Sequence, residues 1–185
     1  ITSDGMAPAV QQAIDAGIPV ITIDRSVTGV TGLLAHVGAD NVKGGEQQGQ
    51  AVVDMFPDGA TIIELQGTPG SAPANDRRKA FAEGIAKHPA LTIIDSQSGD
   101  FRRTGGKEVM EAFIKKHGKN IDVLYAHNDD MALGAVQAIE EAGMKPGSDI
   151  IIVSIDAVRE GVQAVVAGKI NCTVECNPLF GPKVY

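Results

Sequence analysis

The sequence alternates short apolar runs with longer segments in which apolar residues recur at helical spacing. The strand-like runs are 19–23, 33–37, 61–65, 91–95, 122–126, 150–155 and 171–175. Helical patterns occupy most of the gaps between them, at 7–16, 41–55, 74–87, 104–117, 131–142 and 160–167. Strands that alternate with helices in this way are typical of a doubly wound α/β fold with parallel sheets. We therefore predict an α/β chain.

The clearest junction between a strand and a helix lies within residues 122–142. A strand-length apolar run opens this segment, polar residues fill positions 127–130, and a helical pattern follows. In an open parallel sheet, ligands bind at the carboxyl ends of the strands, where this junction would lie. We expect Asp129 or Asp130 to cap the helix, which leaves Asn128 facing a crevice. An amide both donates and accepts hydrogen bonds, which suits a neutral polyhydroxylated ligand better than a phosphate.

Polar residues also stand near the ends of other predicted strands. They include Asp24, Arg25, Arg77 and Asp156, and the aromatic Phe101 stands among the polar residues of segment 96–103. Each has a plain structural explanation: Asp24 and Arg25 would form a surface ion pair, and Asp156 would cap a helix. Nevertheless, the five clusters at 24–25, 67–78, 96–103, 127–130 and 156 stand at the same edge of one predicted sheet, which solvation alone does not explain.

These side chains match the groups on a sugar ring. Asp24 and Asp156 would accept hydrogen bonds from hydroxyl groups, while Arg25 and Arg77 would donate from a rigid fork. Phe101 would cover the apolar face of the ring. A phosphate ligand is less favoured, because the glycine-rich loop that follows one strand lacks both GxxxxGK[ST] and GxGxxG. The residues therefore indicate a carbohydrate site.

No catalytic or metal-binding pattern stands out beside this site. The four histidines are scattered and lack the spacing of a Ser-His-Asp triad or a metal site. Cys172 and Cys176 would lie about 13 Å apart on one strand face, too far for a disulfide. Two aspartates would act as a glycosidase pair only at a separation that the sequence does not give. We predict a binding protein without cofactor or metal, not an enzyme.

Composition excludes several classes of partner. The formal net charge of −7 gives no positive surface for nucleic acid or anionic membranes. No apolar run reaches the roughly 18 residues that span a bilayer. With 185 residues, 43% of them apolar, the chain can bury a core as one large domain or two small ones.

Both ends of the sequence suggest the interior of a longer protein. Residues 1–5 (ITSDG) look like a strand end followed by a turn, and the chain stops at Tyr185 just after a turn that contains proline and glycine. No signal peptide is visible, so the residues alone do not give the compartment.

Seven segments resemble, in the same order, the ribose-binding group of periplasmic sugar-binding proteins, the solute receptors of ABC importers. They are IPVITIDR (18–25), GADNVKGGEQQG (38–49), IIELQGTPGSAPANDRRKAFAEGI (62–85), SQSGDF (96–101), YAHNDDMALGA (125–135), DIIIVSID (149–156) and GKINCTVECNP (168–178). The resemblance covers essentially the whole chain. Within the group, SQSGDF, GKEVMEAF and YAHNDDM are most similar to the members that bind galactofuranose.

The resemblance implies a type I periplasmic binding protein fold: two similar, doubly wound α/β lobes with parallel sheets, joined by a hinge. Residues 1–38 with 177–185 would belong to the N-terminal lobe, and residues 39–176 to the C-terminal lobe. Crossings between the lobes are expected near 38–40 and 176–177. A third crossing and the opening strands would be missing from this sequence.

The resemblance also implies a sugar held between the lobes. Carried over position by position, its expected contacts are Asp24 and Arg25 from the first lobe and Arg77, Phe101, Asn128 and Asp156 from the second. Cys176 stands where ribose binders carry a glutamine, so ribose is a less favoured ligand. Glu175 is a candidate to replace that contact.

The implied function is the solute-binding receptor of a sugar ABC importer, a periplasmic monomer that binds a monosaccharide such as galactofuranose or a related pentose or hexose. Its partners would be this sugar and the membrane permease, without nucleic acid. The alternative is the effector-binding core of a LacI-type transcription regulator, which shares the fold. The segments 168–171 and 58–60 favour the receptor, since regulators tend to carry a proline-containing loop and a Gly-His turn at these places.

Overall fold

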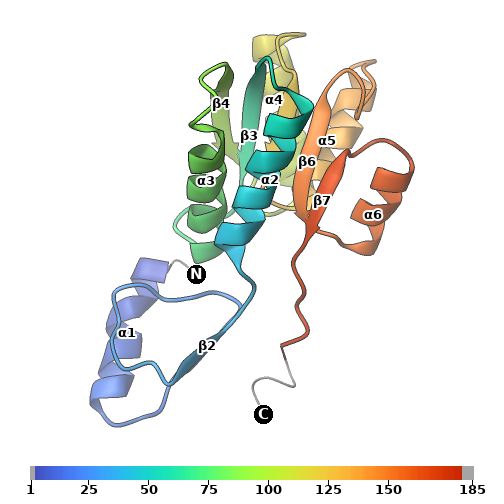
Figure 1. Ribbon diagram of the computed structural model, residues 1–185. Coiled ribbons are helices and arrows are strands. Elements are labelled where there is room, and N and C mark those ends of the chain that lie inside the picture. Colours follow the sequence, from blue (N-terminus) through green and yellow to red (C-terminus); the bar gives the residue numbers. More distant parts are fainter. Residues whose placement is uncertain (1–2, 181–185) are drawn as a thin grey trace.

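The computed structural model describes residues 3–180, in which the strands form two separate parallel sheets (Figure 1). A five-stranded sheet has the order β4-β3-β5-β6-β7, and a two-stranded sheet pairs β1 with β2. Every pairing within the two sheets is parallel. The predicted α/β fold with parallel sheets is therefore confirmed.

The large sheet has a crevice-forming strand order. Its strands are β3 (Ala60–Gln66), β4 (Leu91–Ser98), β5 (Val123–Ala126), β6 (Ile151–Asp156) and β7 (Cys172–Glu175). Strand β3 lies between β4 and β5, so successive crossovers run to opposite sides of β3. In an open parallel sheet, the carboxyl ends of strands at such a point border a ligand-binding crevice.

Helices cover both faces of the large sheet. They are α2 (Asn41–Met55), α3 (Ala72–Ile85), α4 (Arg103–His117), α5 (Asp129–Glu141) and α6 (Arg159–Val166). Helices α2 and α3 pack on one face, and α4 and α5 pack on the other (Figure 1). Each face has its own buried apolar cluster, one around Phe81 and the other around Phe113. Within residues 3–180, no helix combines the length and the apolar character needed to cross a membrane.

The central strand β5 is buried along its whole length. The ring of Tyr125 stacks on Phe81, with 3.9 Å between the ring centroids. A strand that is buried on both faces appears in the sequence as an uninterrupted apolar run, as this one does. This packing fixes the carboxyl end of β5 and therefore the position of the polar residues that follow it.

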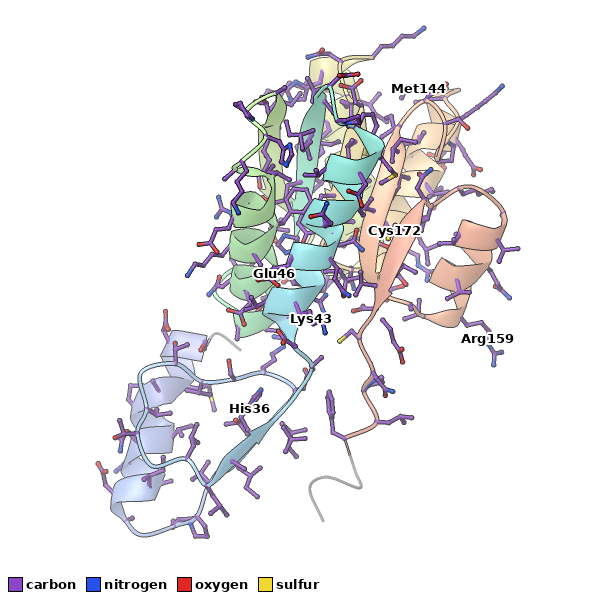
Figure 2. The ribbon with its side chains drawn as sticks, in the orientation of Figure 1. His36, Lys43, Glu46, Met144, Arg159 and Cys172 are labelled. Atoms are coloured by element: carbon purple, nitrogen blue, oxygen red, sulfur yellow. The ribbon has the colours of Figure 1, made fainter. Side chains whose placement is uncertain are left out.

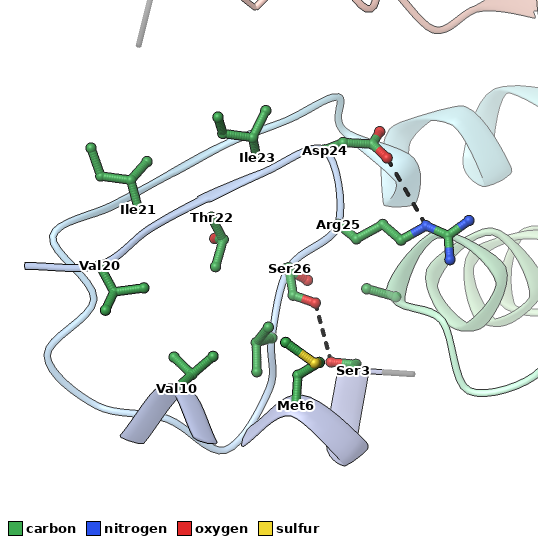
Figure 3. A pocket seen from close by; sticks show the side chains of 12 residues that line it. Ser3, Met6, Val10, Val20, Ile21, Thr22, Ile23, Asp24, Arg25 and Ser26 are labelled. Atoms are coloured by element: carbon green, nitrogen blue, oxygen red, sulfur yellow. Dashed lines mark hydrogen bonds and ion pairs between the residues drawn. The ribbon is translucent and has the colours of Figure 1, made fainter. Parts of the chain in front are cut away.

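The small sheet consists of β1 (Ile21–Ile23) and β2 (Ala35–Val37), with α1 (Ser3–Asp15) beside it (Figure 1). A largely apolar cavity of about 550 Å³ lies between α1 and β1. Figure 3 shows Met6 and Val10 of α1 on one side of it and the residues of β1 on the other. Large apolar side chains are exposed here as well, among them Ile23 at 51% and Leu34 at 66%. A two-stranded sheet buries little apolar surface, so this part has only a thin core.

The chain connects the two sheets at residues 38–40, and it leaves the large sheet again after Glu175 (Figure 1). Strands β1 and β6 lie in different sheets, as the two-lobe arrangement requires. The lobe boundaries given above stay a prediction. Residues 1–2 and 181–185, which the prediction assigns to the first lobe, lie outside the described residues.

The predicted strands and helices are all present, with ends that differ by up to four residues. The opening segment is the exception, because residues 3–5 form the first turn of α1 instead of the predicted strand end and turn. The hydroxyl of Ser3 accepts a hydrogen bond from the backbone N–H of Thr28 at 2.9 Å. The backbone N–H of Ser3 donates to the carbonyl oxygen of Gly70, also at 2.9 Å. These contacts to distant residues hold a locally turn-forming sequence in the helix.

Candidate functional site

A cavity of about 410 Å³, here called the cleft, lies between the carboxyl ends of the large sheet and the end of β1. It is lined by six of the seven predicted site residues: Asp24, Arg25, Arg77, Phe101, Asn128 and Asp156. Cys176, Ala157, Val158 and two prolines complete the lining. The prediction of one common sheet edge is wrong, because Asp24 and Arg25 follow a strand of the small sheet.

Glu175, the seventh predicted residue, lines a neighbouring crevice of about 260 Å³ and not the cleft. This crevice lies beside residues 38–40, and its other lining residues include Asn41, Lys43 and Arg77. Arg77 therefore borders both cavities. A ligand contact for Glu175 stays a prediction.

Arg77 is only 4% exposed, although it carries a charge. All three of its side-chain nitrogen atoms donate hydrogen bonds: Nε to Oδ1 of Asn41 at 3.1 Å, Nη2 to Oδ1 of Asp156 at 3.3 Å, and Nη1 to the carbonyl oxygen of His127. The hydroxyl of Tyr125 donates to the backbone carbonyl of Arg77 at 3.2 Å. A guanidinium group has five N–H donors, so it can satisfy these acceptors and still donate into the cleft.

Asp156 is held in the cleft by an unusual backbone conformation. Its φ is 131° and that of Ala157 is 54°, values that cost free energy unless the surroundings fix them. The buried carboxylate of Asp129 fixes this turn by accepting the N–H of Val158 at 2.9 Å and the hydroxyl of Thr173 at 2.7 Å. The turn therefore depends on contacts from α5 and β7.

Burial raises the pKa of Asp156 to about 6, from an ordinary value of 3.8. The positive charge of Arg77 acts in the opposite direction, whereas the neighbouring Asp129 adds to the increase. The carboxylate of Asp156 is therefore ionised at neutral pH, although burial opposes its charge. In that form it accepts hydrogen bonds from hydroxyl groups.

Asn128 caps α5 itself, because its Oδ1 accepts the N–H of Met131 at 3.0 Å. The predicted cap, Asp129 or Asp130, is therefore wrong: Asp129 is fully buried, and Asp130 forms an ion pair with Arg103 at 2.7 Å. Asn128 still lines the cleft, as expected. Since Oδ1 is engaged in the cap, the amide offers the cleft N–H donors more than acceptors.

Phe101 follows Asp100 in a turn whose two residues both have positive φ, 59° and 56°. This turn places the ring of Phe101 over Gly67, where an added Cβ would stand only 2.0 Å from a ring atom. The guanidinium carbons of Arg25 and Arg77 each lie 5.9 Å from the ring centroid. Cation–π contacts thus link the ring to arginines on both sides of the cleft.

Asp24 and Arg25 occupy the turn that ends β1, with a φ of 66° at Asp24. Nε of Arg25 lies 4.0 Å from Oδ2 of Asp24, and 61% of the Asp24 side chain is exposed. An exposed ion pair of this length contributes little to stability. Both parts of the sequence interpretation therefore coexist: the residues form a loose surface pair, and they line the cleft.

A buried pair beneath the cleft was not predicted from the sequence. Oε1 of Glu64 lies 3.0 Å from Nε2 of His127, whose Nδ1 accepts the N–H of Gly67 at 3.2 Å. This arrangement places the ring proton on Nε2, where it is donated to Glu64. Burial lowers the pKa of His127, although Glu64 acts in the opposite direction. The available signal was Glu64, a lone charged residue in an apolar strand.

Cys172 and Cys176 are both free thiols and half-buried. Figure 2 shows Cys172 on β7, and both residues pack against the apolar cluster around Phe81. Burial raises the pKa of each thiol above its ordinary value. Among residues 3–180, no group of three or more His, Cys, Asp and Glu side chains is arranged to hold a metal ion.

Known proteins are similar to this chain over nearly its whole length. A family model described as a periplasmic binding protein domain matches residues 1–179. The galactofuranose-binding protein of Escherichia coli strain K12 is 47% identical over 98% of this chain and 59% of its own length. The ribose import binding protein of Salmonella typhimurium strain LT2 is 37% identical over 93% of this chain and 56% of its own length.

A solved structure from Mycobacterium smegmatis in complex with β-D-fucofuranose is 49% identical, with a TM-score of 0.93 over 99% of this chain and 62% of that one. The chain therefore spans a little more than half the length of the proteins that it matches. These findings confirm the predicted resemblance to ribose- and galactofuranose-binding proteins, and the alternative of a transcription regulator finds no support in them. Because the family model covers nearly the whole sequence, the chain belongs to the periplasmic binding protein domain family.

Proposed function

We propose that the protein carrying this chain is the solute-binding receptor of a sugar ABC importer and binds a monosaccharide in the cleft. The observation that carries this proposal is the composition of one cavity. Two carboxylates, two guanidinium groups, an amide and a phenyl ring line about 410 Å³, within the roughly 300–1,000 Å³ of small-molecule sites. The proteins described above, named for galactofuranose or solved with fucofuranose, support the furanose form of the sugar.

The cleft offers donors and acceptors suited to adjacent hydroxyl groups. The carboxylate of Asp156 accepts hydrogen bonds from hydroxyls, and Arg77 and Asn128 donate to hydroxyl oxygens. Charge-assisted bonds of this kind are stronger than those between neutral groups. Phe101 supplies an apolar surface for the C–H face of the sugar ring.

Asp24 and Arg25 complete the site from the opposite side of the cleft. Since they follow β1 and the other ligands come from the large sheet, binding requires the two parts to close on the sugar. Closure desolvates the sugar hydroxyls and strengthens their bonds to the charged groups. The receptor would then present the sugar to the membrane permease, as a monomer in the periplasm and without changing the sugar chemically.

Calorimetric titration of the full-length protein tests this function. We would use D-galactose, D-fucose, L-arabinose and D-ribose, and we expect saturable binding of at least one with the sugar recovered unchanged. Asp24→Ala should weaken that binding tenfold or more, about 1.4 kcal/mol, because donors in the closed cleft lose their acceptor. Asp15→Ala, an exposed aspartate of α1, is the matched control and should bind like the wild type.

Two results would contradict the proposal. The first is a wild-type protein that binds none of the four sugars. The second is an Asp24→Ala variant with unchanged affinity, which would return Asp24 and Arg25 to the role of a surface pair.

A further inference from the structure

We propose that Asn41, which was not among the predicted site residues, is a positioning residue: it orients the guanidinium group of Arg77 and couples it to residues 38–40 between the two sheets. This inference rests on the proposed function, because the group that Asn41 orients is a proposed sugar ligand. Asn41 lines the crevice beside the cleft and not the cleft itself. It therefore acts through Arg77.

The amide of Asn41 bonds at both of its ends. Its Oδ1 accepts the N–H of Nε of Arg77 at 3.1 Å, and its Nδ2 donates to the carbonyl oxygen of Ala39 at 3.4 Å. The reverse orientation would set an amide oxygen against a carbonyl oxygen and an N–H₂ group against an N–H. Only one orientation of the amide satisfies both partners.

The bond to Nε matters because Arg77 is almost completely buried. The Nη atoms find acceptors at the ends of β5 and β6, in the His127 carbonyl and the Asp156 carboxylate. Nε carries a single N–H, and Oδ1 of Asn41 is the acceptor that the structure provides for it. Three acceptors from three elements fix both the position and the plane of the guanidinium group. Without Asn41, a buried N–H would lack its partner, and the fork would be free to tilt.

Asn41 is the first residue of α2 and has a fixed place relative to Arg77. Asp40 caps this helix by accepting the N–H of Lys43 at 2.9 Å, and Figure 2 shows Lys43 at the end of α2 that faces the small sheet. Helix α2 packs so closely on α3 that a Cβ added at Gly45 would stand 2.6 Å from the Arg77 carbonyl oxygen. The two helices therefore hold Asn41 and Arg77 together.

The other partner of Asn41 belongs to the connection between the sheets. Ala39 lies in the segment 38–40, so a rotation of the backbone there changes its distance from Asn41. At the second connection, the N–H of Cys176 donates to the backbone carbonyl of Asp156 at 3.2 Å. Each connection thus contacts one residue, Asn41 or Asp156, that accepts a hydrogen bond from the guanidinium group of Arg77. Opening or closing of the cleft would therefore change the hydrogen bonds that hold the guanidinium group of Arg77.

The test compares three variants of the full-length protein, with the sugar that binds the wild type most tightly in the four-sugar titration. Asn41→Leu removes the acceptor with little change in size, whereas Asn41→Asp keeps an oxygen for Nε. We expect Asn41→Leu to weaken sugar binding tenfold or more. Asn41→Asp should lose clearly less affinity, because it keeps the acceptor for Nε and gives up only the longer bond to Ala39, at 3.4 Å. Gln47→Leu, an exposed residue in the same crevice, is the control and should change nothing.

A double-mutant cycle separates positioning from a general loss of structure. In an Arg77→Lys background the fork is absent, so Asn41→Leu should have no further effect on affinity. Thermal unfolding of every variant verifies folding, and Asn41→Ala replaces Asn41→Leu if the latter does not fold. Equal losses in the Leu and Asp variants, no loss in either, or additive effects in the cycle would overturn the positioning role. A wild-type protein that binds no sugar would instead count against the proposed function.

Discussion

Asp156 combines a backbone φ of 131° with a carboxyl group whose pKa burial raises to about 6. In the unfolded chain the same group has its ordinary pKa of 3.8. Between these two values the folded protein keeps a proton that the unfolded chain has lost, so the free energy of unfolding falls as the pH rises. Above the folded pKa the full cost of the buried charge is present.

We therefore expect Asp156→Asn to raise the free energy of unfolding of the unliganded protein near pH 7.5. The difference between 3.8 and about 6 sets an upper bound of about 3 kcal/mol, at about 1.4 kcal/mol for each pH unit. Near pH 4 most of this gain should disappear, because the wild-type carboxyl is then protonated as well. Thermal unfolding of both proteins at the two pH values measures the effect.

The affinity of the same variant for sugar should move in the opposite direction. An amide oxygen is a weaker acceptor than a carboxylate, so we expect a loss of tenfold or more. A stability gain of equal size at both pH values would show that the charge is not its source. Such a trade between stability and ligand binding is common where a site holds a strained or buried charged group.

At single positions, the limits of sequence reasoning come from contacts between distant residues. Asn and Asp are nearly equal as helix caps, so the local sequence could not choose between Asn128 and Asp129. The choice depends on Thr173, whose hydroxyl bonds Asp129 from a strand far along the chain. The bond between Asn41 and Arg77 joins residues 36 positions apart and leaves no local signal either.

At the scale of elements, the turn before α4 shows how backbone geometry and a neighbouring strand act together. The left-handed pair Asp100 and Phe101 aims the ring at Gly67, which follows β3 directly. The loops that follow the paired strands β3 and β4 must therefore match. A side chain at position 67 would compete with the ring for the same space.

We expect Gly67→Ala to weaken sugar binding about tenfold, because the added methyl group would stand 2.0 Å from the present ring position and force the ring of Phe101 to move. Calorimetry with the best-binding sugar measures this loss. Gly84→Ala is the matched control: its Cβ would meet its nearest neighbour at 3.6 Å, an ordinary contact, and should leave the affinity unchanged. Equal affinity of Gly67→Ala and the wild type would mean that the ring does not contact the sugar.

The periodicity of apolar residues located each strand and helix well, because the buried elements leave a strong pattern. The ends were less accurate. Strand β4 continues to Ser98, three residues beyond the predicted end, through polar residues that pair with β3. Such edge positions are polar on both faces and therefore carry no periodic signal. The start of α1 was missed for the related reason that Ser3 is held by distant partners.

At the scale of the whole molecule, the two parts differ in how much apolar surface they bury. The large sheet has apolar clusters on both faces, whereas the small sheet exposes Ile21, Ile23 and Leu34. The chain spans 59% of the length of its galactofuranose-binding relative. In a protein limited to residues 1–185, we therefore expect the small sheet to be much less stable than the large one.

Hydrogen exchange of that protein checks this expectation. The amides of β1 and β2 should exchange far faster than those of β3 and β5, because little buried surface opposes their local opening. The same protein should bind sugar much more weakly than the full-length protein, since the large sheet alone holds only part of the cleft. Similar protection in both sheets, or equal affinity, would contradict the picture of two cooperating lobes.

The separation into two sheets could be predicted only in part from the residue pattern. Alternating strands and helices predicted parallel sheets, but the residues alone favoured one sheet edge for all five clusters. Only the resemblance to a family placed Asp24 and Arg25 on a separate lobe. Nothing in the composition of β1, which has the same apolar character as the other strands, distinguishes its sheet.

The three bonds that fix the buried fork of Arg77 have a consequence for discrimination among ligands. This long side chain is already ordered when the protein folds, so ligand binding does not lose its conformational entropy. A fork that is fixed in this way also cannot turn to find another partner when a hydroxyl is missing. In the proposed sugar complex, a deoxy analogue that lacks the hydroxyl facing Arg77 would leave a buried N–H unpaired, and rigidity itself becomes a source of selectivity.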